Sequence, residues 1–214
     1  MDLSKIRGLY AIADSQWNPC ETLPELVEKF LVGGCKLIQL RMKKNGGQKD
    51  LWDDEVFEVA KKVMRFKNNF DFQFIINDYV DCAAESLADG VHVGKNDMPI
   101  SEIRRRVGNR FLIGYSSHCL KEAIKAEKDG ADYVAIGAIY PTKTKGALHP
   151  IVGIETLRNV TATLNVPVVA IGGINRGNIN EVYKAGASAA AMITTLTKAK
   201  DIVAETRWFV KNIK

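Results

Sequence analysis

The sequence is poor in cysteine and has no long apolar run, and each shortage removes a class of protein. Its four cysteines form neither a CxxC pair nor a metal-ligand spacing, so they predict neither a zinc site nor a redox motif. We expect Cys35, Cys82 and Cys119 to be buried free thiols, which fits a reducing cytoplasm. The N-terminal residues lack the design of a signal peptide, and their apolar run is too short to span a membrane.

Excess charge is also scarce. The 30 basic and 25 acidic residues leave a net charge of +5, and the only tight basic run is 104–106. We interpret that run as a solvated helix face, so we do not expect nucleic-acid binding. A mild positive balance instead suits small polyanionic substrates. The sequence leaves open whether the chain forms a homo-oligomer.

Short apolar runs alternate with longer amphipathic segments along the whole chain. This alternation predicts βαβ units and a parallel sheet. Eight expected strands in 214 residues favour a single (β/α)8 TIM barrel domain over residues 1–214, since an open flavodoxin-like sheet needs only about five. The expected strands are Leu9–Ala13, Leu37–Leu40, Phe72–Ile76, Gly90–Val93, Phe111–Gly114, Tyr133–Gly137, Val168–Ile171 and Ala189–Ile193. Expected helices include Leu23–Leu31, Glu55–Arg65, Leu120–Lys128, Ile154–Leu164, Ile179–Lys184 and Ile202–Val210.

In such barrels the chemistry lies at the carboxyl ends of the strands, and polar or glycine residues follow nearly every expected strand here. Gln39, Arg41 and Lys43 close the second strand, and alternation with a period of two turns all three to one side. An arginine can grip a phosphate bidentately, and a lysine adds a point charge. The alternative is a basic surface turn, but Gln39 and Arg41 lie close to the apolar run.

Asp78 and Asp97 follow the third and fourth strands. Two carboxylates on adjacent strand ends can share Mg²⁺, which prefers few carboxylates together with phosphate oxygens and water. The alternative for Asp78 is an N-cap of a helix that begins near Tyr79, and for Asp97 a capping role before Pro99.

Ser116 and His118 close the fifth strand, outside any nucleophile elbow, so Ser116 is better suited to donate to a phosphate than to attack a carbonyl. His118 could orient this loop, and His92 is interpreted as a residue satisfied inside its strand. The segment 140–146, after the sixth strand, is dense in hydroxyls and cations.

The seventh and eighth strands end in Gly172-Gly173 and Thr194-Thr195. Many barrels bind a phosphate monoester between these two loops, where glycine lets backbone N–H groups approach the oxygens. The sequence therefore indicates two anion sites, one cationic and one built from backbone, as two phosphorylated substrates would need.

An ordered set of short motifs resembles the thiamine-phosphate synthase family over nearly the whole chain. The motifs are Gln39-Leu40-Arg41-x-Lys43, Ile75-Ile76-Asn77-Asp78, Asp89-Gly90-Val91-His92-Val93-Gly94, Gly114-x-Ser116-x-His118, Pro141-Thr142-x-Thr144-Lys145 and Ala170-Ile171-Gly172-Gly173-Ile174. The resemblance implies that a thiazole phosphate displaces diphosphate from hydroxymethylpyrimidine diphosphate to give thiamine phosphate.

The resemblance also implies roles for individual residues. Those for the pyrimidine diphosphate would be Gln39, Arg41, Lys43, Asn77, Ser116 and Lys145, of which Arg41, Lys43, Ser116 and Lys145 would be catalytic. Mg²⁺ would be held by Asp78 and Asp97. The thiazole phosphate would be held by Thr142, Thr144, Gly173, Ile193 and Thr194. Departures from the family pattern are Lys95 in place of glutamine, Met42 in place of glutamate and Thr194 in place of serine.

Three other functions remain open at this point. A thiazole tautomerase of the same superfamily would keep the barrel, but the end of the sixth strand, 137–139, lacks the histidine associated with that branch. A barrel that only binds a phosphorylated ligand would not need the pair of aspartates. A sugar-phosphate epimerase would need paired acid and base carboxylates, which no suitable strand ends supply.

Overall fold

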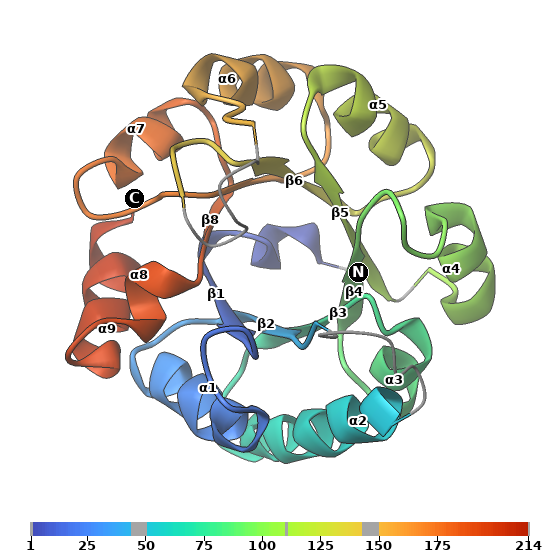
Figure 1. The fold of residues 1–214 in the computed structure, drawn as a ribbon. Coiled ribbons are helices and arrows are strands. Elements are labelled where there is room, and N and C mark those ends of the chain that lie inside the picture. The colour runs from blue at the N-terminus through green and yellow to red at the C-terminus, as the bar shows by residue number, and fades with distance from the viewer. Residues whose placement is uncertain (1, 44–50, 110, 143–149, 214) are drawn as a thin grey trace.

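A computed structural model describes residues 2–43, 51–109, 111–142 and 150–213. These residues form one closed barrel of eight parallel strands, in which every strand pairs with its neighbours in sequence and the last pairs with the first. Figure 1 shows the barrel from one end, with the strands inside a ring of helices. The expected (β/α)8 barrel is confirmed.

The strands lie close to the expected positions: Gly90–Val93, Tyr133–Gly137 and Val168–Ile171 have the expected bounds, and the others differ by one to three residues at one or both ends. The eight strands are β1 (Gly8–Asp14), β2 (Leu37–Arg41), β3 (Gln73–Asn77), β4 (Gly90–Val93), β5 (Leu112–Ser117), β6 (Tyr133–Gly137), β7 (Val168–Ile171) and β8 (Ala189–Met192). The helices are α1 (Leu23–Val32), α2 (Leu51–Met64), α3 (Val80–Glu85), α4 (Ile100–Val107), α5 (Leu120–Lys128), α6 (Ile154–Thr163), α7 (Ile179–Lys184), α8 (Thr194–Thr197) and α9 (Ile202–Asn212). Short 3-10 turns cover Leu3–Lys5, Cys20–Thr22 and Arg65–Asn68.

The core has two separate parts because each strand is buried on both faces. One face packs on the helices and contributes residues such as Ile38, Ile76 and Ile113. The other face fills the barrel interior, where Tyr10 and Tyr133 are among the largest fully buried side chains. Burial on both faces explains why the strands read as continuous apolar runs.

The end of β5 differs from the expectation in a way that matters for the site. The strand continues to Ser117, so Ser116 lies within the sheet, opposite Ala135 of β6. A residue held in a strand has a fixed backbone, so Ser116 is positioned more rigidly than a loop residue would be.

One expectation about the cysteines is wrong. Cys35 and Cys82 are buried, but Cys119 is exposed, because it is the N-cap residue of α5 at the surface. All four cysteines are free. Within the described ranges no helix is both long enough and apolar enough to cross a membrane.

Candidate active site

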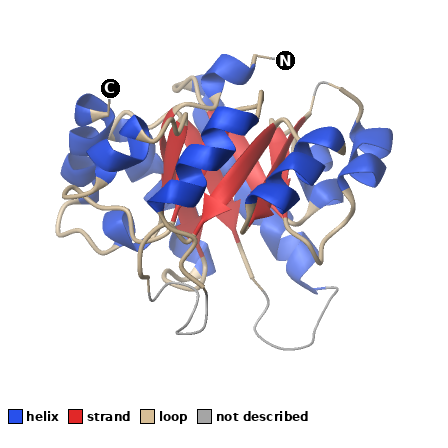
Figure 2. Cartoon of the chain, turned by 90° about the horizontal axis from the view of Figure 1, so that it is seen from above, coloured by secondary structure: helices blue, strands red, loops and turns tan. Residues whose placement is uncertain are grey.

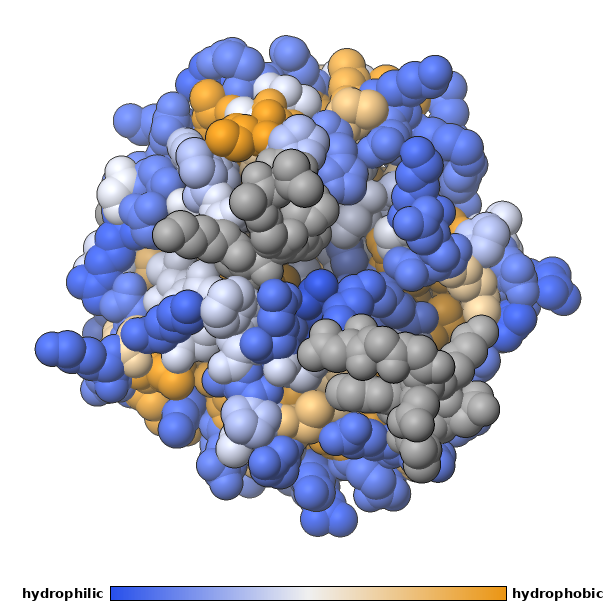
Figure 3. Space-filling view, in the orientation of Figure 1, coloured by the Kyte–Doolittle hydropathy of each residue, from blue (hydrophilic) through white to orange (hydrophobic). Residues whose placement is uncertain are grey.

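The polar strand ends gather at one end of the barrel. Figure 2 shows both chain termini at the opposite end, and Figure 3 shows hydrophilic side chains near the centre of the face seen in Figure 1. Two cavities open into the barrel there, and they share Ile171, Ala191 and Ile193 as lining residues. The cavities are therefore neighbours, and these three apolar residues form a wall that both of them share.

The first cavity has a polar floor made by strands β1 to β5. Gln39, Arg41, Asn77 and Ser116 all line it, as the sequence predicts. The remaining lining residues are Tyr10, Ile12, His92, Ala135 and Val169, with the three shared residues. Side chains from separate motifs thus meet in one place.

Arg41 is held by a carboxylate that strand pairing places beside it. Asp14 of β1 is directly opposite Arg41 of β2 in the parallel register. Arg41 Nη1 donates to Asp14 Oδ2 at 2.5 Å, and the Asp14 side chain has no exposed surface. The pairing fixes the Arg41 guanidinium at the rim of the cavity, and the other N–H groups of the guanidinium remain for a ligand.

Lys43 Nζ forms an ion pair with Asp78 Oδ2. Burial raises the pKa of the Asp78 carboxyl, Lys43 acts in the opposite direction, and the nearby charge of Asp97 raises the pKa further. Asp97 itself accepts from the backbone N–H of Gly94 at 2.7 Å. Two carboxylates therefore lie close together with a cation beside them.

The capping alternatives for these aspartates are not found. The N-cap residues of α3 and α4 are Tyr79 and Pro99, and neither helix has a side-chain cap hydrogen bond. Asp78 has a φ of 68°, a left-handed conformation that aspartate tolerates better than most residues. This turn lets Asp78 face Lys43 and Asp97 instead of capping α3.

The pair of aspartates fits a hard divalent cation that also binds the substrate. In the part of the chain described, no group of three or more His, Cys, Asp or Glu side chains could hold a metal. Burial, and after it the charge of Asp97, raises the pKa of Asp78, and two such neighbouring carboxylates form the kind of incomplete shell that Mg²⁺ completes with phosphate oxygens and water.

Asn77 carries an unused donor inside the first cavity. Its side chain is 6% exposed, and Nδ2 has no hydrogen-bond partner among the described residues. Leaving a buried amide donor unpaired costs about 1–3 kcal/mol. A ligand with a hydrogen-bond acceptor would remove that cost, which favours a binding role for Asn77.

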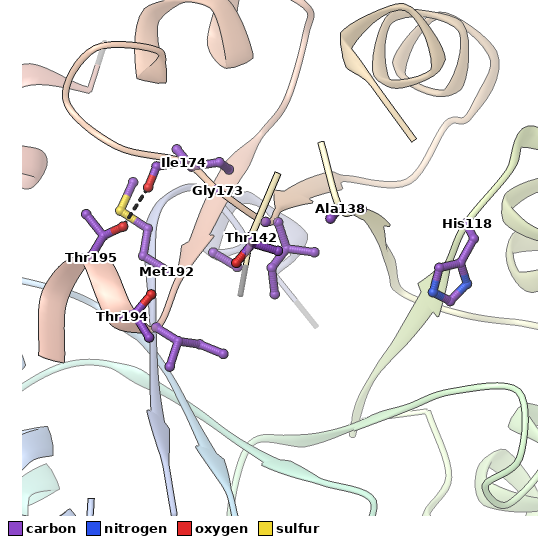
Figure 4. Close-up of a pocket in the computed structure, with 13 residues that line it drawn as sticks. His118, Ala138, Thr142, Gly173, Ile174, Met192, Thr194 and Thr195 are labelled. Atoms are coloured by element: carbon purple, nitrogen blue, oxygen red, sulfur yellow. Dashed lines mark hydrogen bonds between the residues drawn. The ribbon is translucent and has the colours of Figure 1, made fainter. Parts of the chain in front are cut away.

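The second cavity lies between β6, β7 and β8 (Figure 4). Four residues that the resemblance assigns to the thiazole phosphate line it, namely Thr142, Gly173, Ile193 and Thr194. A Cβ atom on Gly173 would lie 2.6 Å from the Pro141 carbonyl oxygen, and this glycine has a φ of 66°. The close approach brings the segment after β6 against the loop after β7. Thr144 and Lys145 lie outside the described residues.

The loop after β8 is anchored to the loop after β7. Thr195 Oγ1 donates to the Ile174 carbonyl at 2.7 Å, the contact drawn in Figure 4. The neighbouring Thr194 starts the short helix α8 and faces the cavity. Backbone N–H groups and hydroxyls, with little charge, make this cavity suitable for a phosphate monoester.

Three further residues lie at the site that were not among the ligands expected from the sequence. His118 lines the second cavity from the side of β5, where Figure 4 shows it across the cavity from Thr194. Glu122 accepts from the His118 backbone N–H at 2.9 Å and lies near its ring. Tyr10 lines the first cavity, and Asp14 holds Arg41. In the sequence, Asp14 is a polar residue directly after the first apolar run, and Tyr10 is a tyrosine inside that run.

Comparison with known proteins gives a consistent result. The family described as thiamine monophosphate synthase matches residues 9–196. A thiamine-phosphate synthase of Shouchella clausii is 39% identical over 196 residues, covering 92% of this chain and 91% of that protein. One from Pyrococcus furiosus is 38% identical over 202 residues, covering 94% and 92%.

Solved structures agree. A thiamine phosphate pyrophosphorylase from Pyrococcus furiosus superimposes with a TM-score of 0.84 at 34% identity, covering 99% of both chains. A 3-hexulose-6-phosphate synthase superimposes with a TM-score of 0.72 at 18% identity, covering 97% of this chain and 100% of the other. The latter likeness concerns the fold alone.

Proposed function

The chain belongs to the thiamine monophosphate synthase family, and we propose that its two cavities bind the two substrates of that reaction. The enzyme is a transferase that joins hydroxymethylpyrimidine diphosphate to hydroxyethylthiazole phosphate and releases diphosphate, giving thiamine phosphate.

The observation that carries this assignment is the shared wall between the cavities. Ile171, Ala191 and Ile193 line both of them, so ligands in the two cavities would meet beside these residues. One cavity offers an arginine, an amide and a hydroxyl, and the other offers glycine backbone and threonine hydroxyls. A diphosphate suits the first cavity and a phosphate monoester suits the second.

The reaction breaks one bond and forms one. The bond from the pyrimidine methylene carbon to the diphosphate oxygen breaks, and diphosphate leaves with the electron pair. The thiazole nitrogen then gives its lone pair to the methylene carbon, forming the new C–N bond. The aminopyrimidine stabilises a methylene cation, so the protein mainly has to position the partners and neutralise the leaving group.

Arg41, Lys43 and Ser116 are suited to neutralise and hold the departing diphosphate. The Arg41 guanidinium is 15% exposed and keeps its orientation through Asp14, so it is prepared for an anion before one arrives. Gln39 and Asn77, which are nearly buried at the floor, would contact the pyrimidine ring. Lys145 is proposed to join the diphosphate contacts.

Asp78 and Asp97 are the residues that would hold Mg²⁺. When bound, the ion would neutralise charge on the diphosphate oxygens. Lys43, which pairs with Asp78 in the structure, would then be available to the diphosphate itself. The apolar wall would meanwhile keep water from the methylene carbon.

The thiazole phosphate would lie in the second cavity. Thr142, Thr144 and Thr194 would donate hydroxyls, and Gly173 and Ile193 would contribute backbone contacts. The anchoring of Thr195 to Ile174 supports a preformed shape for this cavity, because it ties the two loops together.

A reconstituted assay tests the function. Purified protein is mixed with both substrates and Mg²⁺, and product is followed by chromatography. Thiamine phosphate should appear only when both substrates and the metal are present. Interconversion of thiazole isomers without diphosphate release would instead indicate a tautomerase. A folded protein that catalyses neither reaction would contradict the assignment.

A further inference from the structure

Five side chains form a continuous hydrogen-bonded series across the barrel, here called the interior chain. The Gln39 amide Nε2 donates to the Tyr10 hydroxyl at 2.8 Å, which lies 2.8 Å from the Tyr133 hydroxyl. His92 Nδ1 lies 3.1 Å from the Tyr133 hydroxyl, and His92 Nε2 lies 2.8 Å from Ser116 Oγ. Both ends of the interior chain are residues assigned above to the pyrimidine diphosphate.

The interior chain connects strands that are not neighbours. Tyr10 belongs to β1 and Tyr133 to β6, so their hydrogen bond crosses the interior of the barrel. Tyr10, Tyr133 and His92 are 1%, 0% and 6% exposed, which keeps bulk water away from these groups. Hydrogen bonds in such a position are costly to leave unmade.

A glycine makes room for the centre of the interior chain. A Cβ atom on Gly114 would lie 2.1 Å from Tyr133 Cζ and 2.5 Å from His92 Nδ1. Gly114 does not have a positive φ, so the strand conformation does not require glycine there. The need for glycine in the middle of β5 comes from the packing of Tyr133 against His92, whose rings stack with centroids 5.5 Å apart.

The direction of the interior chain follows from counting protons. An amide nitrogen only donates, and a phenol has one proton to give. Because Gln39 donates to Tyr10, the buried Tyr10 proton is satisfied only if it goes to Tyr133, and the Tyr133 proton then goes to His92 Nδ1. The His92 proton then lies on Nε2 and is donated to Ser116. The proton of Ser116 is left for a ligand.

Two further observations support this direction. Burial raises the pKa of the Tyr10 and Tyr133 phenols far above the ordinary value, so both keep the protons that the series needs. At the other end, the terminal oxygens of a diphosphate with Mg²⁺ bound are acceptors, so a hydroxyl that contacts them must donate. The Gln39 end and the substrate end therefore require the same direction of hydrogen-bond donation, from Gln39 toward Ser116.

We propose that Tyr133 and His92 are positioning residues. Tyr133 holds His92 in the Nε2–H tautomer, and His92 keeps the Ser116 hydroxyl directed as a donor to the departing diphosphate. The proposal rests on the function assigned above. Both residues act on the diphosphate through Ser116, although His92 also lines the first cavity.

The first test needs only the wild-type protein. The chain has three histidines, so their imidazole ¹⁵N signals can be separated, and those of His92 are identified by their loss in His92→Gln. The measurement is made at the pH of the activity assay. Protonated Nε2 with unprotonated Nδ1 supports the proposal. A proton on Nδ1, alone or together with Nε2, overturns it, because the interior chain would then run toward Gln39.

The second test uses Tyr133→Phe, which keeps the ring and removes the hydroxyl. Loss of a group that fixes a histidine tautomer typically costs about 10- to 100-fold, so kcat should fall by that range while the KM for the thiazole phosphate stays unchanged. The control is Tyr183→Phe, which removes a hydroxyl that donates to the Gly8 carbonyl at 2.8 Å, far from the cavities. An unchanged kcat in a folded Tyr133→Phe protein would contradict the proposal.

A double-mutant cycle separates positioning from general damage. On a Ser116→Ala background, Tyr133→Phe should cause little further loss of kcat, because the hydroxyl it orients is already absent. Equal fold-losses in both backgrounds would overturn the proposal. If the wild-type protein made no thiamine phosphate, the assigned function would fail, while the tautomer measurement would still decide the direction of the interior chain.

Discussion

The Asp14 carboxylate is completely buried and lies 2.5 Å from the Arg41 guanidinium. The two residues are partners across the β1–β2 ladder, so strand pairing itself brings the charges together. A buried carboxylate is tolerated when it is paired and hydrogen-bonded, and Asp14 also accepts from the Gln16 backbone N–H at 3.0 Å. We propose that Asp14 orients Arg41 for the diphosphate.

Asp14→Asn should weaken binding of the pyrimidine diphosphate because Arg41 loses the charge that orients it. Asparagine keeps the shape and can still accept from Gln16. We expect the KM for this substrate to rise about 10-fold, the equivalent of ~1.4 kcal/mol. Urea unfolding should show a loss of about 1–3 kcal/mol, since a half-buried guanidinium is left unpaired.

Asp129→Asn is the matched control for this change. It removes the same charge from an ion pair with Lys125, whose side chain is 74% exposed. An exposed pair is worth no more than about 1 kcal/mol, so stability and kinetics should barely change. Equal KM values for wild type and Asp14→Asn would show that Arg41 needs no orienting partner.

Asp78→Asn should raise the Mg²⁺ concentration needed for half-maximal activity. The change removes one of the two carboxylates proposed to hold the ion, and Asp97 alone is a weaker site. We expect a shift of at least about 10-fold, in line with the loss of one charged ligand. The measurement is a Mg²⁺ titration of the initial rate at saturating substrates.

Asp81→Asn controls for the charge change in the same region. Asp81 lies in α3, three residues further along, and its side chain is 72% exposed beside Arg106. Its titration curve should match that of the wild type. A curve for Asp78→Asn that coincides with the wild-type curve would remove Asp78 from the metal site.

The sequence was sufficient to predict the barrel and the convergence of its strand ends. Apolar runs on β1 to β8 were readable because both faces are buried, and the side of Gln39 and Arg41 followed from the period of two. These features depend only on neighbours in the chain. A local pattern therefore carries them.

The partners of these residues could not be predicted in this way. Tyr10 and Tyr133 meet across 123 residues of sequence, and nothing near either one indicates the other. The local pattern around Asp78 equally allowed a helix cap, and only its φ of 68° turns it toward Lys43. Cys119 looked buried in a helical context, but the start of α5 is at the surface.

Thr194→Val should weaken binding of the thiazole phosphate. Valine has the same shape but lacks the hydroxyl, and a hydrogen bond to a charged group is worth about 1.5–3 kcal/mol. The KM for the thiazole phosphate should therefore rise at least about 10-fold, with the KM for the pyrimidine diphosphate unchanged. Thr163→Val is the control, since that exposed threonine only donates to the Asn159 carbonyl within α6. Equal rises in both KM values would argue against a specific phosphate contact.

Gly173 and Gly108 have nearly the same φ but different surroundings. Their φ values are 66° and 71°. A Cβ atom on Gly173 would lie 2.6 Å from the Pro141 carbonyl and 2.8 Å from Tyr140 Cβ, whereas one on Gly108 would meet nothing within 4 Å. Comparing alanine substitutions at these two glycines separates the effect of a positive φ from the effect of a steric clash at the second cavity.

Gly173→Ala should therefore damage the thiazole-phosphate site, and Gly108→Ala should not. Both variants place alanine at a positive φ and should lose about 1–2 kcal/mol of stability, measured by urea unfolding. Only Gly173→Ala must also push away the segment after β6 that carries Thr142, so only that variant should raise the KM for the thiazole phosphate. If the two variants lose equal stability and both keep the wild-type KM, then the close approach of Gly173 to Pro141 has no role in shaping the site.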